Sequence, residues 1–382
     1  MNFTRTRRSA LTAVLLAATL IGVSACGSSD PAPAAGGGTA SGGAAGGDTV
    51  TVNALNIVSL APLFVAQDKG FFADHGISNE YSTNDIYSTL SVQSQGSIDV
   101  NIPGLGGAFF NAVNQGLKMK AVADRNQYRC TSDSMLVSST AAGITDAEGL
   151  RGKKVAILAK GSSTEYWLDL FLQSAGMSQA DLGGVVNLTY PDTVNALKTG
   201  AVDAGFLTQP LAYQSIADGT AQRVKATYEI APDEQQGLIT MSQNFLDGSP
   251  DVATRWLAGW LEGVRYYQDP ANKDDVVAIV AAHTSVPAET VAALYGTDQW
   301  PYMDPNGAVD TATAMSDDGQ WLLDNKIVET LPEPSVWYDA TPVTKAVELI
   351  GSAPAGNSCG DASATTGSSG ASASASTTAT SS

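Results

Sequence analysis

The order of strand and helix signals constrains this chain more than any other feature. Residues 49–55 alternate apolar and polar side chains, which is the period of a strand, and Pro62 then begins an apolar helix that Gly70 ends. The same order recurs through residue 207. It predicts strands near 80–82, 98–102, 119–123, 154–158, 185–188 and 204–207, and helices near 88–95, 106–115, 163–174 and 194–199. This alternation predicts parallel β-sheets covered by helices on both faces.

The pattern changes after Gly237. We expect a strand at 238–241 and then a long amphipathic helix at 251–268. Its apolar residues recur at three- and four-residue spacing: Val252, Trp256, Trp260, Val264 and Tyr267. Such an aromatic stripe indicates a packing face rather than a ligand site. The remainder, 274–351, is predicted to be mainly helical and to pack back onto the first part of the fold.

Two similar segments suggest two similar lobes. Gly96-Ser97-Ile98-Asp99-Val100 and Gly200-Ala201-Val202-Asp203-Ala204 each follow a predicted helix and lead into a predicted strand. Junctions of this kind also recur by chance in α/β proteins, so the repeat by itself leaves that alternative open.

The two ends of the chain do not read as part of a fold. Arg5, Arg7 and Arg8 precede an apolar run over residues 10–23 that is too short for a transmembrane helix. The run ends in Val23-Ser24-Ala25-Cys26, which resembles a bacterial lipobox. The resemblance implies a signal peptide over 1–25 and attachment of an acyl chain such as palmitate to Cys26. An ordinary secretory signal and a twin-arginine signal are the alternatives, and the residues after Arg7-Arg8 fit the latter poorly.

Composition defines the segments beside these ends and excludes some partners. Residues 26–47 are rich in Gly, Ala, Ser and Pro, which is typical of a flexible tether, and 354–382 read as a disordered low-complexity tail.

The formal net charge is −18, and it becomes more negative when the signal is removed with its three arginines. An acidic surface repels nucleic acid and anionic lipid, so we expect no nucleic-acid partner and no membrane contact except the lipid anchor. We expect a monomer.

Few residues suit catalysis, a metal or a cofactor. The two histidines, His75 and His283, are not in metal-ligand spacing, and the sequence has no nucleophile elbow, P-loop or dinucleotide fingerprint. The sequence therefore predicts no catalytic residue, no metal and no cofactor. Outside the lipobox only Cys130 and Cys359 remain, and an oxidising exterior would allow them to form a disulfide.

One motif resembles a known family. Residues 62–72 (P-L-F-V-A-Q-D-K-G-F-F) resemble the opening of the sulfonate/nitrate/taurine and thiamine-pyrimidine-precursor binding proteins of ABC importers. The resemblance continues through 96–100, 150–156, 161–163 and 200–204 in the same order. It implies a type II periplasmic-binding-protein fold, with two doubly wound α/β lobes joined by a two-segment hinge. Lobe 1 would comprise 48–136 plus 236–353 and lobe 2 would comprise 137–235, with hinges near 134–138 and 234–240.

The ligand is expected between the lobes, beyond the carboxyl ends of the strands, where loops lead into helix N-termini. The strongest candidate is the loop 161–164, for which simple N-capping by Ser162 or Ser163 is the alternative. Tyr87 is expected to stack on a planar or apolar ligand body. The full candidate set is Ser59, Pro62, Leu63, Asp85, Tyr87, Gly104, Leu105, Gly106, Gly161, Ser162, Ser163, Glu165, Asp192, Thr208 and Gln209.

The charge of the ligand stays open at this point. Glu165 departs from the sulfonate binders, which commonly have a histidine or a neutral polar residue there. With Asp85 and Asp192 it would favour a ligand with an amine or an N-heterocycle. Arg125 and Arg129 flank the first hinge and suit a carboxylate or a sulfonate.

These features together predict an exported lipoprotein on the outer face of the cell membrane. It would capture a small organic solute and deliver it to the permease and ATPase subunits of an ABC importer. Two alternatives remain: an enzyme of the thiamine-pyrimidine-synthase type on the same fold, and a ligand-sensing surface lipoprotein without a transporter.

Overall fold

The computed structural model describes residues 47–354. The predicted signal peptide, Cys26, the tether up to residue 46 and nearly all of the predicted tail, with Cys359, lie outside these residues. Within the described part, no helix combines the length and the apolar character needed to cross a membrane.

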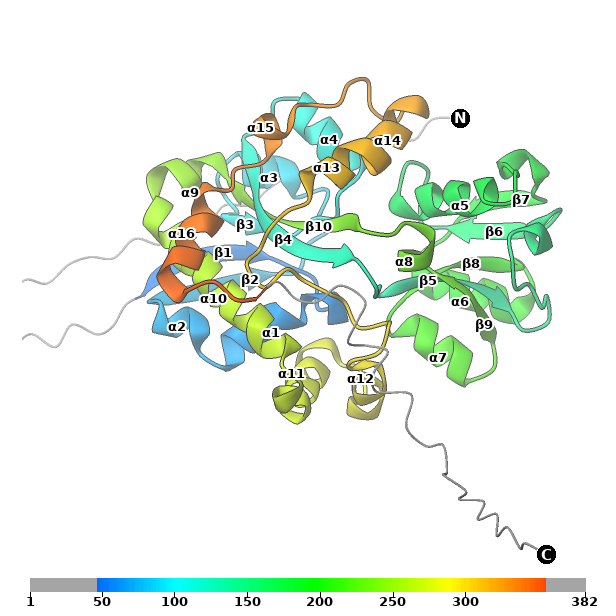
Figure 1. The fold of residues 1–382 in the computed structure, drawn as a ribbon, viewed down its shortest axis with the longest axis horizontal. Helices are drawn as coiled ribbons and strands as arrows, with labels where there is room; N and C mark the ends of the chain where they lie inside the picture. Colours follow the sequence, from blue (N-terminus) through cyan, green and yellow to red (C-terminus); the bar gives the residue numbers. More distant parts are fainter. Residues whose placement is uncertain (1–46, 355–382) are drawn as a thin grey trace, which may run out of the picture. The chain divides into compact units, whose positions relative to one another are not determined.

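The first sheet has five strands in the order β2-β1-β3-β10-β4 (Figure 1). β1 pairs in parallel with β2 and β3, whereas β10 is antiparallel to β3 and β4. The strands are β1 (Asp48–Asn53), β2 (Ile77–Ser82), β3 (Val100–Asn101), β4 (Met119–Tyr128) and β10 (Glu234–Ser242).

The second sheet has the order β7-β6-β8-β5-β9, in which β5 is antiparallel to β8 and β9. Its strands are β5 (Ser134–Ser139), β6 (Lys154–Ile157), β7 (Gly184–Asn187), β8 (Ala204–Thr208) and β9 (Ala221–Ala226). The two-lobe α/β architecture is confirmed, but both sheets are mixed where the alternation predicted parallel sheets. The connectivity explains the difference, because β5 and β10 are each the first strand after the chain passes from one sheet to the other.

The chain passes between the sheets a few residues before the expected positions. The expected hinges near 134–138 and 234–240 lie inside β5 and β10, which are paired within the second and first sheet, respectively. The connecting residues are therefore 129–133 on the way out and 231–233 on the way back. The placement of lobe boundaries and of hinge motion stays a proposal.

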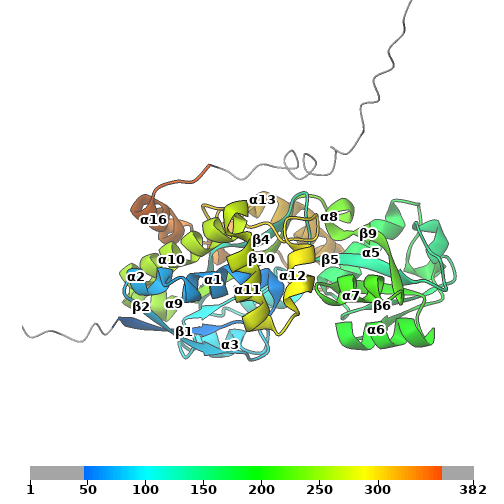
Figure 2. The same cartoon turned by 90° about the horizontal axis from the view of Figure 1, so that it is seen from below.

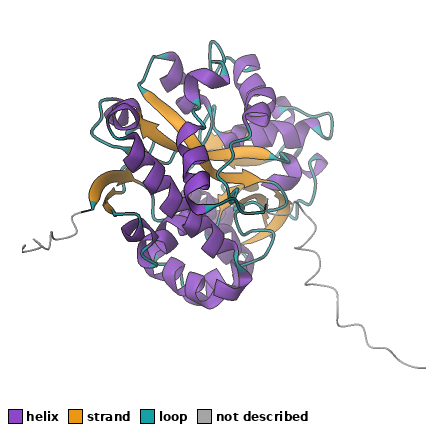
Figure 3. Ribbon diagram, turned by 60° about the vertical axis from the view of Figure 1, so that its left-hand side comes forward, coloured by secondary structure: helices purple, strands orange, loops and turns teal. Residues whose placement is uncertain are grey.

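Helices cover both sheets, as the views in Figures 2 and 3 show. Those of the first lobe are α1 (Ala61–Asp68), α2 (Phe71–Asp74), α3 (Leu90–Ser94), α4 (Gly107–Asn114), α9 (Gln243–Gly248), α10 (Pro250–Gln268), α11 (Lys273–Thr284), α12 (Ala288–Leu294), α13 (Thr311–Thr313), α14 (Gln320–Asp324), α15 (Pro334–Trp337) and α16 (Thr341–Ile350), with a π-helical turn, η5 (Ala314–Gly319), before α14. Those of the second lobe are α5 (Ser163–Gln173), α6 (Tyr190–Thr199), α7 (Leu211–Ala217) and α8 (Thr227–Ile230). Short 3₁₀ turns are η1 (Val58–Leu60), η2 (Glu148–Leu150), η3 (Gln179–Asp181) and η4 (Pro270–Asn272).

The predicted amphipathic helix is the centre of the first-lobe core. In α10, Trp256 and Trp260 are fully buried and lie parallel at a centroid distance of 6.4 Å, and Tyr267 is buried on the same face. α10 packs against α1, whose Leu63 and Val65 are also fully buried. The aromatic stripe is therefore packing surface, as its spacing predicted.

The similar segments 96–100 and 200–204 occupy equivalent places in the two sheets. A carboxylate oxygen of Asp99 accepts the backbone N–H of Thr51 in β1 at 2.8 Å, and one of Asp203 accepts that of Lys154 in β6 at 2.9 Å. Gly96 and Gly200 both have positive φ, at 83° and 73°, which favours glycine. The repeat therefore reflects two lobes built on one plan.

Candidate functional site

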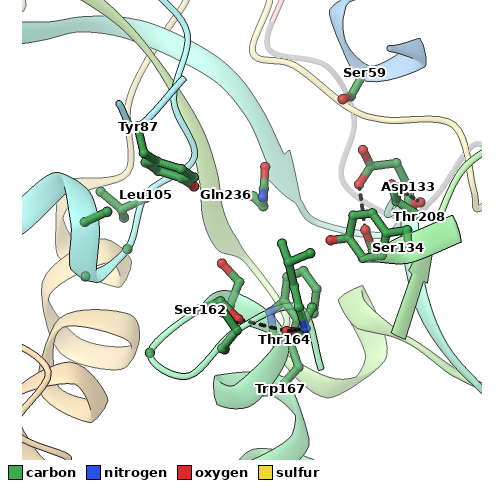
Figure 4. Close-up of a pocket in the computed structure, with 18 of the residues that line it drawn as sticks. Ser59, Tyr87, Leu105, Asp133, Ser134, Ser162, Thr164, Trp167, Thr208 and Gln236 are labelled. Carbon is green, nitrogen blue, oxygen red and sulfur yellow. Dashed lines mark hydrogen bonds between the residues drawn. The ribbon is translucent and has the colours of Figure 1, made fainter. Parts of the chain in front are cut away.

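A cavity of about 500 Å³ is lined by residues of both lobes (Figure 4). Loops at the ends of strands and the starts of helices form most of its wall, as expected for an α/β fold. Its lining residues are Ile57, Ser59, Tyr87, Leu105, Gly106, Gly107, Ala108, Asn111, Arg125, Tyr128, Asp133, Ser134, Leu158, Ala159, Lys160, Gly161, Ser162, Ser163, Thr164, Trp167, Tyr190, Thr208, Gln236 and Ile327.

Two bulges in the β4–β10 pair bring Arg125 and Gln236 to this wall. Along the two strands, Gln235 pairs with Gln127 and Gly237 pairs with Asn126, so Gln236 of β10 has no partner in the ladder. The next pair is Leu238 with Asp124, so Arg125 of β4 has no partner either. A bulge re-aims the side chain of its extra residue, and here both side chains line the cavity.

The guanidinium of Arg125 is buried, with 6% of the residue exposed. Nη1 donates to Oγ of Ser59 at 3.2 Å and Nη2 donates to Oε1 of Gln236, while Nε has no hydrogen-bond partner among the described residues. No carboxylate of the described chain forms an ion pair with this guanidinium. A buried cation of this kind favours a ligand with an anionic or strongly accepting group.

Glycine at position 237 makes the room for this guanidinium. A Cβ on Gly237 would overlap Nε of Arg125 and would lie 2.6 Å from its Cζ. The φ of Gly237 is not positive, so the need for glycine at this position is steric and not conformational.

Asp133 supplies a buried carboxylate to the same cavity. The residue is 7% exposed, and its Oδ1 accepts hydrogen bonds from the hydroxyls of Tyr128 at 2.7 Å and Ser134 at 3.3 Å. Burial holds the pKa of Tyr128 well above its ordinary value, so this phenol stays a neutral donor. Oδ2 of Asp133 has no hydrogen-bond partner within the described residues and is available to a ligand.

The N-terminus of α5 forms a further part of the wall. No side chain caps the helix, because Oγ of Ser162 donates to the carbonyl of Ala159 at 2.6 Å and pairs with Oγ1 of Thr164 at 2.8 Å. Simple N-capping by Ser162 or Ser163 is therefore wrong. The N–H of Glu165 bonds the carbonyl of Ser162, whereas those of Ser163 and Thr164, at the very start of the helix, have no partner within the described residues.

Aromatic and aliphatic side chains complete the cavity. Trp167 is held by a hydrogen bond from Nε1 to Glu234 at 2.6 Å, and its ring lies 5.7 Å from that of Tyr128. Ile327 closes another side, where a Cβ on Gly107 or on Gly161 would lie 2.6 or 2.8 Å from its Cγ2. The wall therefore combines an apolar body with a few polar groups, as solute sites do.

Comparison with known proteins identifies the family. The model of the NMT1-like family matches residues 43–281, which is more than half of the chain. The chain belongs to the NMT1-like family. A nitrate/nitrite binding protein, NrtA of Synechococcus elongatus, is 23% identical over 320 residues, which cover 72% of this chain and 69% of that protein.

Solved structures of similar proteins show the same fold. The periplasmic aliphatic sulphonate binding protein SsuA of Escherichia coli has a TM-score of 0.63 at 18% identity, over 76% of this chain and 92% of that one. The desulfurization enzyme DSZB has a TM-score of 0.60 at 14% identity, over 79% and 99%. The fold of this family therefore also occurs in an enzyme.

About half of the residues predicted for the site of this NMT1-like protein line the cavity. They are Ser59, Tyr87, Leu105, Gly106, Gly161, Ser162, Ser163 and Thr208. They lie at the ends of strands, at the starts of helices or in the segments between them, which is where the rule for open sheets places ligands. Whether they bind a solute stays a prediction.

Four of the other predicted residues have structural roles and do not line the cavity. Pro62 and Leu63 are buried in the first-lobe core, since the family motif that they open is a helix packed on α10. Gly104 forms a bridge with Gly237, and Gln209 is buried and accepts the N–H of Tyr213 at 3.0 Å.

The acidic residues expected at the site do not line the cavity. Asp85 accepts the N–H of Ser88 at 2.8 Å, and Asp192 accepts the hydroxyl of Thr189 at the start of α6. Glu165 turns back to accept the N–H of Gly161 at 2.6 Å. Each carboxylate accepts a hydrogen bond from a nearby group of the chain. These three residues therefore do not support a ligand with an amine. Asp133, which the sequence did not single out, is the carboxylate that does line the cavity.

Two further side chains that the sequence drew attention to also lie elsewhere. Arg129 donates to Gln127 and lies over the ring of Tyr302, outside the cavity. Cys130 is disulfide-bonded in the structure. Its predicted partner Cys359 lies outside the described residues, so their pairing stays a prediction.

No group of residues in the described part of the chain suits a metal ion. His75 pairs with Glu262 at 3.0 Å, and His283 pairs with Asp68 and stacks on Phe64 at a centroid distance of 4.7 Å.

Proposed function

We propose that this protein is the solute-binding component of an ABC importer, and that it holds a small organic solute in the cavity between its lobes. The observation that carries the proposal is the buried guanidinium of Arg125, which faces a cavity of about 500 Å³ without a carboxylate partner among the described residues. Isolating a charge from water is costly unless another group compensates it, and a bound ligand can supply that group.

Membership of the NMT1-like family supports the transport role. NrtA is named for nitrate and nitrite and SsuA for aliphatic sulphonates, and both have this two-lobe fold. The solute of this chain differs from nitrate in our proposal, because the cavity is much larger than such an ion and has aromatic walls. Closure of the lobes on the ligand would be a hinge motion through 129–133 and 231–233.

We further propose that Cys26 is acylated and that residues 26–47 form the tether from the membrane to the lobes. A tether of this length would keep the receptor close to its permease at high effective concentration. Labelling of cells with an azide-bearing fatty acid tests the anchor: label on the wild type and its loss in Cys26→Ser are expected. Label that persists in Cys26→Ser would contradict it.

A thermal-shift screen of the mature protein tests the solute-binding role. The panel contains nitrate, aliphatic sulfonates, taurine, pyrimidines, aromatic acids and flavins, since a ligand of the native state alone raises the melting temperature. At least one stabilising compound is expected. A panel without any stabilising compound would count against the receptor.

The likeness to DSZB makes an enzyme the second candidate. The same samples are therefore analysed for products by chromatography. Turnover of a compound would favour the enzyme, and stabilisation without turnover favours the receptor. Genes for a permease and an ATPase beside this one would separate the receptor from a sensor.

A further inference from the structure

The cavity contains two buried groups of opposite charge that do not pair with each other. We propose that its ligand is an organic zwitterion, with its acidic group on Arg125 and its ammonium or other N–H donor on Asp133. The inference rests on the proposed function, because it assigns the class of solute that the same cavity takes.

Arg125 is available to the acidic group. The carboxylate of the adjacent residue, Asp124, is engaged elsewhere: Oδ1 accepts the side-chain amide of Gln235 at 2.7 Å and Oδ2 accepts the N–H of Asp304 at 2.7 Å. Its partners Ser59 and Gln236 are neutral, so they orient the guanidinium without forming an ion pair with it. A carboxylate or a sulfonate is the ligand group that a guanidinium binds best.

Asp133 is available to the donor. Its main-chain carbonyl accepts the N–H of Gln209 at 2.7 Å and the hydroxyl of Thr208 at 3.1 Å, which fixes the residue at the end of β8. Figure 4 shows Asp133 beside Thr208 and Ser134, on the side of the cavity away from Tyr87 and Leu105. With Oδ1 taken by Tyr128 and Ser134, Oδ2 is left to accept a hydrogen bond, and it repels a second anionic group placed nearby.

A ligand with a single charge cannot form an ion pair with both Arg125 and Asp133. A pure anion would pair with Arg125 but would leave Oδ2 of Asp133 without a donor. A pure cation would pair with Asp133 but would leave Arg125 without an anionic partner. Lys160 also lines the cavity, but its side chain is exposed and therefore contributes less. The rings of Tyr87, Trp167 and Tyr190 suit an apolar or planar body between the charged groups.

Charge-matched sets of probes test the proposal by thermal shift and calorimetry on the mature protein. One set is 4-aminobutanoate, butanoate and butylamine, and the other is tyrosine, 3-(4-hydroxyphenyl)propanoate and tyramine. In at least one set the zwitterion should bind about tenfold or more tighter than both analogues. The proposal is overturned if neither set shows this preference, or if neither zwitterion binds at about 10 mM.

Asp133→Asn adds a test at the residue itself. It should abolish the preference for the zwitterion and leave the affinity for the anion equal or higher, because the neutral amide no longer attracts an ammonium. Asp192→Asn removes the same charge outside the cavity and should keep the preference. An unchanged preference in Asp133→Asn overturns the proposal, as does an equal loss in Asp192→Asn.

These outcomes are distinct from failure of the receptor. If anions of the wider panel bind and no zwitterion is preferred, the receptor role stands and the zwitterion proposal is wrong. If no compound of either panel binds, the receptor role itself is wrong.

Discussion

Arg125 and Gln236 are hydrogen-bonded to each other from two bulges that face each other in adjacent strands. Neither residue has a partner in the ladder, so both side chains lie in the cavity wall while the strands around them stay paired. The pair joins β4 to β10, the last strand before the chain leaves the first lobe and the first strand after it returns. The ligand group that binds Arg125 would therefore lie against the two strands that lead to the connections between the lobes.

Gly237→Ala should weaken ligand binding about tenfold or more, because its Cβ would push the guanidinium of Arg125 out of place. We expect a loss of stability of about 1–3 kcal/mol from the overlap. Gly248→Ala is the matched control, since a Cβ there meets no atom within 4 Å. Calorimetric titration of both variants measures the effect, and equal affinities would contradict the role given to Gly237.

Gly107→Ala should also weaken ligand binding, because the new side chain would overlap Ile327 in the cavity wall. The new Cβ would lie 2.6 Å from Cγ2 of Ile327, and overpacking of this kind costs about 1–3 kcal/mol. Removal of the obstructing side chain in Gly107→Ala/Ile327→Ala should restore part of the affinity. A double-mutant cycle on the free energy of binding checks this, and simple additivity would show that the two positions do not act on each other.

Trp321→Phe should destabilise the protein through the loss of one hydrogen bond between α14 and α5. Nε1 of Trp321 donates to Oδ2 of Asp169 at 2.9 Å, and a bond to a charged group contributes about 1.5–3 kcal/mol. Trp300→Phe is the control, because Trp300 is equally buried but its Nε1 has no partner among the described residues. Urea unfolding should show the larger loss in Trp321→Phe, and a larger loss in Trp300→Phe would argue against this bond.

Asp124 should make stability depend on pH. Burial raises the pKa of this carboxyl to about 7, although hydrogen bonds from Asp304 and Gln235 oppose the rise. Because the pKa is higher in the folded than in the unfolded state, the folded protein binds the extra proton. This contribution to stability is full below about pH 4 and is lost as the pH rises through about 7.

Asp124→Asn removes that dependence. The variant should therefore gain stability relative to the wild type between pH 5 and pH 8, as measured by urea unfolding at both values. Asp247→Asn, an exposed carboxylate on α9, should show no such change. The same difference between Asp124→Asn and wild type at both pH values would refute the assignment.

The sequence predicted the helices and strands whose side chains follow a regular period. It did not predict the bulges, where that period is interrupted. α10 was recognisable because Trp256 and Trp260 recur at four-residue spacing. The loops at Tyr87 and Ser162 were recognisable because they follow strands. The bulges that expose Arg125 and Gln236 depend on the register between two strands far apart in the chain, and only the glycine inside the strand at 237 signals one.

Local sequence patterns misplace two kinds of residue. Pro62 and Leu63 belong to the motif that carries the resemblance to the family, but in the structure they begin a buried helix. Asp133 lies in the connection between the sheets, where no period applies, and tertiary contacts with Tyr128 and Thr208 bring it to the cavity. The acidic residues that the sequence favoured had donors of their own within a few residues.

The central claim is that a solute binds at Arg125 in the cavity between the lobes. The most direct measurement is isothermal titration of the wild type and of Arg125→Gln with the compound that stabilises the native protein most. We predict saturable binding of one molecule to the wild type and a loss of about 100-fold or more in Arg125→Gln, with native far-ultraviolet circular dichroism in both. Equal affinity in a folded Arg125→Gln would contradict the claim.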